Sequence, residues 1–200
     1  MYRHFFKRVL DIVISLAAII FTLPILCVLI ILVSAESKGG FLFKQKRMGR
    51  NAKPFEILKI RSMYVNHGKT KQLLTVNNDS RITKTGKWIR KYKLDELPQF
   101  YNVLFGDISI VGPRPEVFKY ESFYTGEFAK VLSVKPGITD LASLKFIDES
   151  LLLSASGDVE KTYTEQILPE KLRINLDYVE NAGFRQDVSI IFKTFITIIS

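Results

Sequence analysis

Residues Ile12–Ala35 read IVISLAAIIFTLPILCVLIILVSA, a run of about 24 residues without a charged side chain. A helix of about 20 apolar residues is long enough to cross the hydrocarbon core of a bilayer. This run is apolar on every face, and a small domain could hardly bury such a helix on all sides. Arg3, Lys7 and Arg8 precede it, as in a signal peptide, but the run is long for the apolar part of one. The sequence therefore predicts a membrane helix.

Pro24 lies in the middle of this run, where proline kinks or breaks a helix at a cost of about 3 kcal/mol. A helix that enters the membrane, breaks at Pro24 and leaves on the same face would need its freed backbone groups satisfied, for example by Thr22 or Ser15. Basic residues at both ends also oppose placing one end outside. A re-entrant helix and a single span both stay open. The flanking basic residues are Lys7, Arg8, Lys38, Lys44, Lys46, Arg47 and Arg50.

The composition bounds the rest of the chain. Its 200 residues suffice for one domain with a core, and we divide them into a membrane helix over residues 1–36 and a remainder over residues 37–200. The net charge of +9 favours an anionic partner, which is a nucleic acid, a lipid surface or a phosphorylated substrate. Cys27 is the single cysteine, so the chain forms no internal disulfide and no Cys/His metal cluster.

The body is predicted to be α/β, mostly helical with short strands. Residues 41–43 and 54–60 are predicted strands on either side of a basic turn at 44–51, and residues 64–86 a polar loop. A helix is expected over residues 85–92, and residues 148–170 are expected to be a surface excursion with some helix. Residues 184–200 are predicted to form an amphipathic helix at the membrane interface, with an ordinary core helix as the alternative.

The segment Leu94–Gln99 reads LDELPQ and carries two adjacent carboxylates. Apolar residues at positions 97, 100, 101 and 104 follow helical spacing, and Pro98 suits a first helical turn. The helix is therefore predicted to begin close to Asp95, where backbone amides and the helix dipole stabilise an anion. An N-cap role for Asp95 and a first-turn role for Glu96 are a complete structural explanation by themselves.

Arg114 lies between two prolines in Gly112-Pro113-Arg114-Pro115. Prolines fix the backbone and lower the entropy lost when the guanidinium is placed, and arginine is suited to bidentate contact with phosphate. The segment predicts a phosphate contact, and a proline-rich turn with a solvated arginine is the alternative.

Taken together, these segments resemble the small monotopic phosphoglycosyl transferases, the bacterial sugar transferase family. The resemblance covers nearly the whole chain, from residue 2 to about residue 193. One segment alone would be weak, but six in order at family-like spacing are specific. They are Lys7-Arg8-Val9-Leu10-Asp11, FKQKRMG at residues 43–49, FEILKIRSM at residues 55–63, LDELPQ at residues 94–99, GPRP at residues 112–115 and KPGIT at residues 135–139.

The resemblance implies a re-entrant N-terminal helix, interfacial amphipathic helices and a place on the cytoplasmic face of the bacterial inner membrane. It implies transfer of a sugar-1-phosphate from a UDP-sugar to a polyprenyl phosphate, with Asp95 as nucleophile and Glu96 beside it. It also implies Mg²⁺, with Asp95 and Glu96 as its ligands. The positions expected around the phosphates or holding the site are Lys59, Arg90, Arg114 and Asp187, and those expected at lipid phosphates are Lys7 and Arg8.

Two segments depart from the family pattern. Leu23-Pro24 stands where a Ser-Pro pair is usual, although Thr22 could supply the hydroxyl. Residues 140–143 read DLAS where many members have Gly-Leu-Ala-Gln. The sugar, the polyprenol length, the downstream pathway and the oligomeric state, including a homodimer, stay open.

The expected chemistry suits these residue types. Adjacent residues on a helix point about 100° apart, so Asp95 and Glu96 have separate tasks: Asp95 attacks phosphorus, and Glu96 contacts Mg²⁺ or orients the site. The attack gives a covalent phosphosugar intermediate and splits one transfer into two.

Two rival functions stay open. One is direct one-step transfer, with Asp95 only a metal ligand. The other is a non-catalytic, membrane-tethered domain that binds anions. Scattered basic residues argue against nucleic acid as a partner, and the lack of a Gly-rich phosphate loop argues against a kinase.

Overall fold

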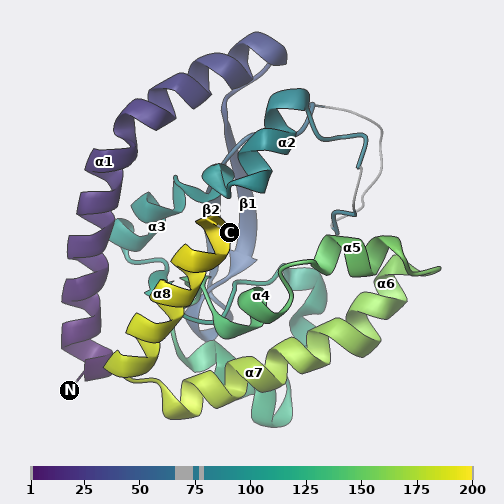
Figure 1. The fold of residues 1–200 in the computed structure, drawn as a ribbon. Helices are drawn as coiled ribbons and strands as arrows, with labels where there is room; N and C mark the ends of the chain where they lie inside the picture. The colour runs from purple at the N-terminus through teal and green to yellow at the C-terminus, as the bar shows by residue number, and fades with distance from the viewer. Residues whose placement is uncertain (1, 66–73, 77–78, 200) are drawn as a thin grey trace.

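A computed structural model describes residues 2–65, 74–76 and 79–199, and it is mostly helical with two small sheets (Figure 1). The strands are β1 Leu42–Met48, β2 Pro54–Ile60, β3 Ser109–Val111 and β4 Gly137–Thr139. The α-helices are α1 Lys7–Glu36, α2 Lys84–Lys91, α3 Gln99–Phe105, α4 Leu141–Lys145, α5 Glu149–Ser154, α6 Val159–Thr162, α7 Leu168–Asn181 and α8 Phe184–Ile199. Short 3₁₀ or π turns are η1 Tyr2–Phe6, η2 Arg50–Ala52, η3 Leu94–Glu96, η4 Phe118–Phe123, η5 Gly126–Ser133 and η6 Tyr163–Ile167.

The prediction of a mostly helical α/β chain is confirmed. The basic segment 44–51 is a correction, because most of it continues β1 rather than forming a turn. β1 pairs with β2 in an antiparallel hairpin, from Leu42 opposite Ile60 to Met48 opposite Pro54. The lysines in β1 are exposed, whereas Met48, at the end of the strand, is buried in a core cluster.

The predicted loop at residues 64–86 is wrong at its end, where α2 begins at Lys84 and Thr83 caps it by accepting from the Gly86 amide. Residues 66–73 and 77–78 of that loop lie outside the described residues. The helices expected near residues 85–92, within 148–170 and over 184–200 are present as α2, as α5 and α6, and as α8. The prediction that residues 148–170 are a surface excursion is wrong, because Leu153, Tyr163 and Ile167 are buried in the core.

Helix α1 runs through Pro24 without interruption, and its axis bends as it passes over the molecule above α2 (Figure 1). Thr22 Oγ1 donates to the Ala18 carbonyl at 2.7 Å, whereas the buried Ser15 hydroxyl has no hydrogen-bond partner among the described residues. By length and composition α1 is the one described helix able to span a membrane. Only 17% of its most apolar 18-residue stretch is buried.

The start of α1 is bonded to the body of the chain. Arg8 donates to the carbonyls of Val103 and Leu104 at the end of α3. Asp11 accepts from the Ser109 hydroxyl at 3.0 Å and from the Ile110 amide at 2.9 Å. These bonds hold the first turns of the helix against α3 and β3.

The end of α1 is bonded to the same body. Leu26, Leu29 and Val33 bury apolar surface against Ile60 and Ile89. The two oxygens of Glu36 accept from the amides of residues 84 and 85 at 2.7 and 3.0 Å, at the start of α2. The helix ends at Glu36, where the predicted first part of the chain also ends, but whether that part is a separate unit stays a prediction.

The parallel pair β3–β4 brings two distant segments together, and Gly112 and Gly137 make this possible. Val111 pairs with Thr139. A Cβ added at Gly137 would lie 2.1 Å from the Gly112 nitrogen and 2.4 Å from its carbonyl oxygen. Both are backbone atoms that cannot rotate away, so residue 137 must be glycine.

We expect Gly137→Ala to destabilise the fold by about 2 kcal/mol or more, because the clash forces the two strands apart. The matched control is Gly157→Ala, where an added Cβ meets no atom within 4 Å; it should change the free energy of unfolding by less than about 0.5 kcal/mol. Thermal unfolding in detergent measures both, and equal midpoints would contradict the argument.

Candidate active site

Asp95 and Glu96 lie in the 3₁₀ turn η3, directly before α3. The expected helix start near Asp95 is a correction, because α3 begins at Gln99 and Asp95 makes no capping hydrogen bond. The chain before α3 forms a 3₁₀ turn instead, in which the Leu97 amide donates to the Leu94 carbonyl at 3.3 Å.

Glu96 is held by two cations from different parts of the fold. Its Oε1 accepts from Lys59 Nζ, in β2, at 2.9 Å and from Arg114 Nη2, after β3, at 2.5 Å. Burial by itself raises the pKa of Glu96, but the Arg114 and Lys59 charges outweigh it and hold that pKa well below its usual range. Glu96 is therefore an anion fixed in place.

Asp95 is in a different electrostatic state, although it is the neighbouring residue. It is 7% exposed, and its contact is an ion pair with Lys59 Nζ at 3.8 Å. Burial raises the pKa of Asp95, the Glu96 charge adds to the rise, and Lys59 opposes it. Among the residues that the structure describes, no group donates a hydrogen bond to this carboxylate.

Cations surround the pair. The Glu96 charge raises the pKa of Arg114, so this guanidinium stays charged. Burial lowers the pKa of Lys59, and the nearby Arg114 charge adds to the fall. Arg90 lies on α2, near enough for its charge to lower the pKa of Asp95. The structure therefore brings Lys59 and Arg114 into contact with the predicted dyad, whereas the place of Arg90 at the phosphates stays a prediction.

Asp187 is not in this cluster. It lies at the start of α8, 4% exposed, and accepts from the Tyr2 hydroxyl at 2.6 Å, the Tyr178 hydroxyl at 2.8 Å and Lys7 Nζ. It ties α1, α7 and α8 together, which fits the structural half of its predicted role.

Lys7 and Arg8 both have partners within the chain, namely Asp187 for Lys7 and the end of α3 for Arg8. Their predicted contact with lipid phosphates stays a prediction.

Sequence reasoning missed the residues that place Arg114. The Asp140 carboxylate accepts from the Arg114 amide at 2.6 Å, and Arg47 donates to the Pro115 carbonyl at 3.0 Å. In sequence, Asp140 lies 26 residues from Arg114, and Arg47 lies 68 residues from Pro115. Asn102 fixes α3 to β2 in the same way, accepting from the Leu58 amide at 2.9 Å. No local pattern signals contacts over such separations; the departure at residues 140–143 was the available hint.

The carboxylate pair also limits metal binding. Among the described residues, no group of three or more His, Cys, Asp or Glu side chains is placed to hold a metal ion. Mg²⁺ in phosphate-transfer sites takes one or two carboxylates and completes its shell with water and substrate phosphates. Asp95 and Glu96 fit that smaller role, with the open oxygens of Asp95 the more available.

A largely buried pair of carboxylates in contact with Lys59 and Arg114 is an arrangement suited to binding phosphate groups. Residues 2–200 match the model of the family described as bacterial sugar transferase, and the chain belongs to this family.

Relatives agree with that assignment. The chain is 38% identical over 192 residues to a UDP-glucose:undecaprenyl-phosphate glucose-1-phosphate transferase of Klebsiella pneumoniae, covering 94% of this chain and 39% of that protein. It is 31% identical over 191 residues to a protein of the same name from Caulobacter vibrioides, covering 94% and 67%. It is 34% identical over 199 residues to a UDP-N-acetylgalactosamine-undecaprenyl-phosphate N-acetylgalactosaminephosphotransferase of Aeromonas hydrophila, covering 98% and 44%. The chain thus spans about two fifths of the length of two of these three relatives.

Proposed function

We propose that this chain transfers a sugar-1-phosphate from a UDP-sugar to undecaprenyl phosphate through a covalent intermediate on Asp95. The observation that carries the proposal is the contrast within the dyad. Glu96 is fixed by two cations, whereas Asp95 is buried, accepts no hydrogen bond from the described residues and keeps its oxygens available. The donor and acceptor classes follow the printed names of the relatives.

The residues suit the first step. An Asp95 oxygen forms a bond to the sugar-side phosphorus while the bond from that phosphorus to the bridging oxygen breaks, and the nucleoside monophosphate leaves. Carboxylate and diphosphate repel each other, so Arg114 and Lys59 act by neutralising charge that develops on the phosphoryl oxygens. Asp95 and Glu96 would hold Mg²⁺, which when bound neutralises further phosphate charge.

In the second step an oxygen of the polyprenyl phosphate attacks the same phosphorus and Asp95 leaves as a carboxylate. The attacking oxygen is already an anion, so no strong general base is needed. One-step transfer with Asp95 as a metal ligand is the rival, and it predicts no covalent adduct.

Intact-protein mass spectrometry tests the proposal. The detergent-solubilised chain is mixed with a panel of UDP-sugars and Mg²⁺, without acceptor. A mass gain equal to one sugar phosphate supports the covalent route. If the mass does not increase but lipid product still forms when undecaprenyl phosphate is added, the one-step rival is favoured. If there is neither a mass increase nor a product, the proposed function is refuted.

The proposal includes a re-entrant α1 at the cytoplasmic face of the inner membrane. Its support is that both ends of the helix bind one compact body, Arg8 at α3 and Glu36 at α2. A straight span would separate these two ends by the membrane thickness of about 30 Å. Helix α8 adds an exposed apolar surface suited to the interface, made of Phe184, Val188, Phe192, Phe195 and Ile196.

Cysteine labelling tests this topology. In a Cys27→Ser background, Phe5→Cys and Lys38→Cys should both resist a membrane-impermeant maleimide in intact cells and react in inside-out vesicles, since both residues lie on one side. Lys53→Cys, on the β-hairpin, reports the side of the body. Labelling of either helix end from outside the cell would contradict the re-entrant arrangement.

The fall in the rate of adduct formation at low pH should depend on Lys59. This cation lowers the pKa of Asp95, so Lys59→Met should raise that pKa, and the carboxylate would be protonated at a higher pH. Since only the ionised form attacks, the pH at which adduct formation falls to half should move upward. The exposed Lys53→Met is the control and should leave it unchanged; a downward shift in Lys59→Met would contradict the electrostatics.

A further inference from the structure

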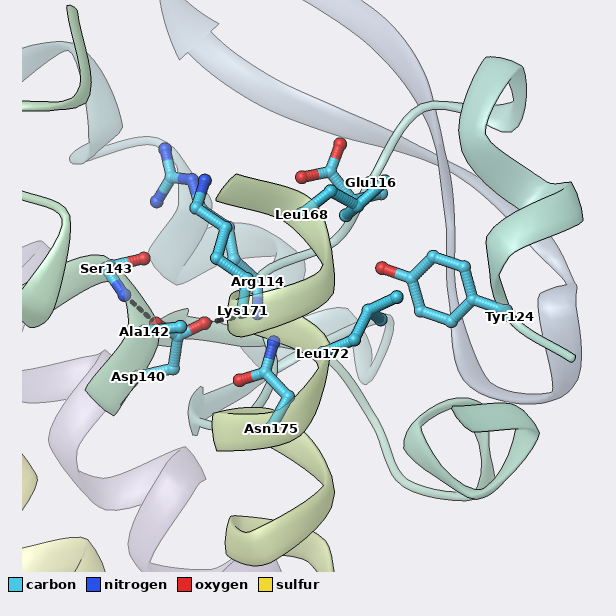
Figure 2. A pocket seen from close by; sticks show the side chains of 10 residues that line it. All are labelled: Arg114, Glu116, Tyr124, Asp140, Ala142, Ser143, Leu168, Lys171, Leu172 and Asn175. Atoms are coloured by element: carbon cyan, nitrogen blue, oxygen red, sulfur yellow. Dashed lines mark hydrogen bonds between the residues drawn. The ribbon is translucent and has the colours of Figure 1, made fainter. Parts of the chain in front are cut away.

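A pocket lies beside Arg114, between the segment after β3, the first turn of α4 and one face of α7 (Figure 2). Arg114 belongs both to this pocket and to the active site, because its Nη2 donates to Glu96. The pocket and the candidate active site therefore share one residue, Arg114.

The charged side chains around the pocket are already paired within the chain. Asp140 accepts from the amides of Arg114 and Ser143. Glu116 accepts from the Tyr163 hydroxyl at 2.6 Å, and Lys171 pairs with Glu149. The pocket is thus not built to bind a further charge.

Two neutral polar groups in the pocket are unused. Asn175, on α7, is 5% exposed, and its Oδ1 has no hydrogen-bond partner among the described residues. The Tyr124 hydroxyl, on a side chain that is 8% exposed, likewise bonds to no described residue. In Figure 2 the Tyr124 hydroxyl points toward Leu172 and the Asn175 amide lies on the other side of that leucine. Leaving a buried polar atom unpaired is costly, so the Asn175 oxygen calls for a partner.

The shape of the pocket limits that partner. Its interior has room for a group of about the size of a water molecule, too little for a nucleobase or a whole sugar ring. Leu168 and Leu172 form apolar walls. The unpaired Asn175 oxygen accepts a hydrogen bond and the neighbouring walls are apolar, so the group that fits is small, neutral and able to donate, as a hydroxyl is.

We infer that this pocket receives one hydroxyl of the transferred sugar, and that Asn175 and Tyr124 help to determine which sugar the enzyme accepts. The inference rests on the proposed function. In that reaction Asp95 and Arg114 act on the sugar-side phosphorus, to which the sugar is directly attached, whereas the ribose is attached to the other phosphorus. Asp140 and Ser143, in the segment that departs from the family pattern, border the same pocket.

The test compares single-turnover adduct formation between donors. Three kinds of donor are compared. They are the UDP-sugar that the wild-type chain accepts, analogues of it that each lack one sugar hydroxyl, and its 2′-deoxyuridine analogue. The proteins are wild type, Asn175→Ala, Tyr124→Phe and, as a control, Tyr92→Phe, whose side chain is exposed and outside the pocket.

We expect one deoxy-sugar to lower the wild-type rate constant about tenfold, as for loss of one well-placed hydrogen bond. Asn175→Ala should lose about tenfold with the full sugar and almost nothing further with that same deoxy-sugar, because both changes remove one interaction. Tyr124→Phe should show the same non-additivity with a smaller loss, and Tyr92→Phe should match wild type.

An equal loss with every donor in Asn175→Ala would mean a structural role and overturn the inference. Non-additivity with the 2′-deoxyuridine donor would place the ribose in the pocket and overturn it as well. If Asn175→Ala does not fold, purely additive effects in Tyr124→Phe overturn it. A wild-type chain that reacts with no UDP-sugar removes the proposed function and the inference with it.

Discussion

Asp95→Asn should abolish the covalent adduct and lower lipid-linked product formation at least about a thousandfold, because an amide cannot replace the attacking carboxylate. The substitution preserves size and adds no charge to a site where Asp95 is buried. Intact mass and radiolabelled product measure the two effects. We expect no change in the thermal midpoint large enough to explain the loss.

The matched control is Asp177→Asn, a carboxylate on the exposed part of α7 whose Oδ1 accepts from the Asn181 amide at 2.9 Å. It should retain activity within about twofold, because exposed polar contacts contribute little. If Asp95→Asn still formed product at near wild-type rates, Asp95 would not be the nucleophile.

Arg114→Ala should lower the rate of adduct formation by about 100-fold or more, since a fixed donor to developing phosphoryl charge contributes on that scale. It also removes one of the two cations on Glu96. Arg114→Lys should recover only part of the rate, because an ammonium group does not reproduce the planar guanidinium and its several donors.

Arg173→Ala is the control for Arg114. Its side chain is 71% exposed and pairs with Glu170 three residues away, so activity should change by less than about twofold. A loss below about fivefold in Arg114→Ala, with the protein folded, would show that Arg114 is structural rather than a phosphate contact.

Local sequence patterns predicted helices and strands best where apolar residues follow one clear pattern. The apolar run gave α1, and the spacing along residues 184–200 gave α8. Prediction failed where lysine-rich sequence was taken for a turn, because β1 is half exposed and its pairing with β2 outweighs its composition. The start of α3 was expected near Asp95 and lies four residues later, at Gln99, because residues 94–96 form a 3₁₀ turn.

The candidate site was also predicted only in part from the sequence. The sequence indicated Asp95, Glu96 and Arg114, since adjacent carboxylates and a proline-framed arginine are visible locally. It did not indicate that Lys59 and Arg114 both donate hydrogen bonds to Glu96, whereas Asp95 makes a longer ion pair with Lys59, and this difference separates the two carboxylates in role. Nor did it indicate the unpaired Asn175 beside Arg114.

The sequence by itself determined the apolar helix around residues 12–35, the family of the chain and the residue types at its candidate site, because these depend on composition and short spacing. Only the tertiary structure decided that both ends of α1 bind one body and which cation faces which carboxylate. It also decided that Asp95 keeps its oxygens available. These features depend on contacts between residues up to 99 positions apart, and packing rather than local pattern fixes such contacts.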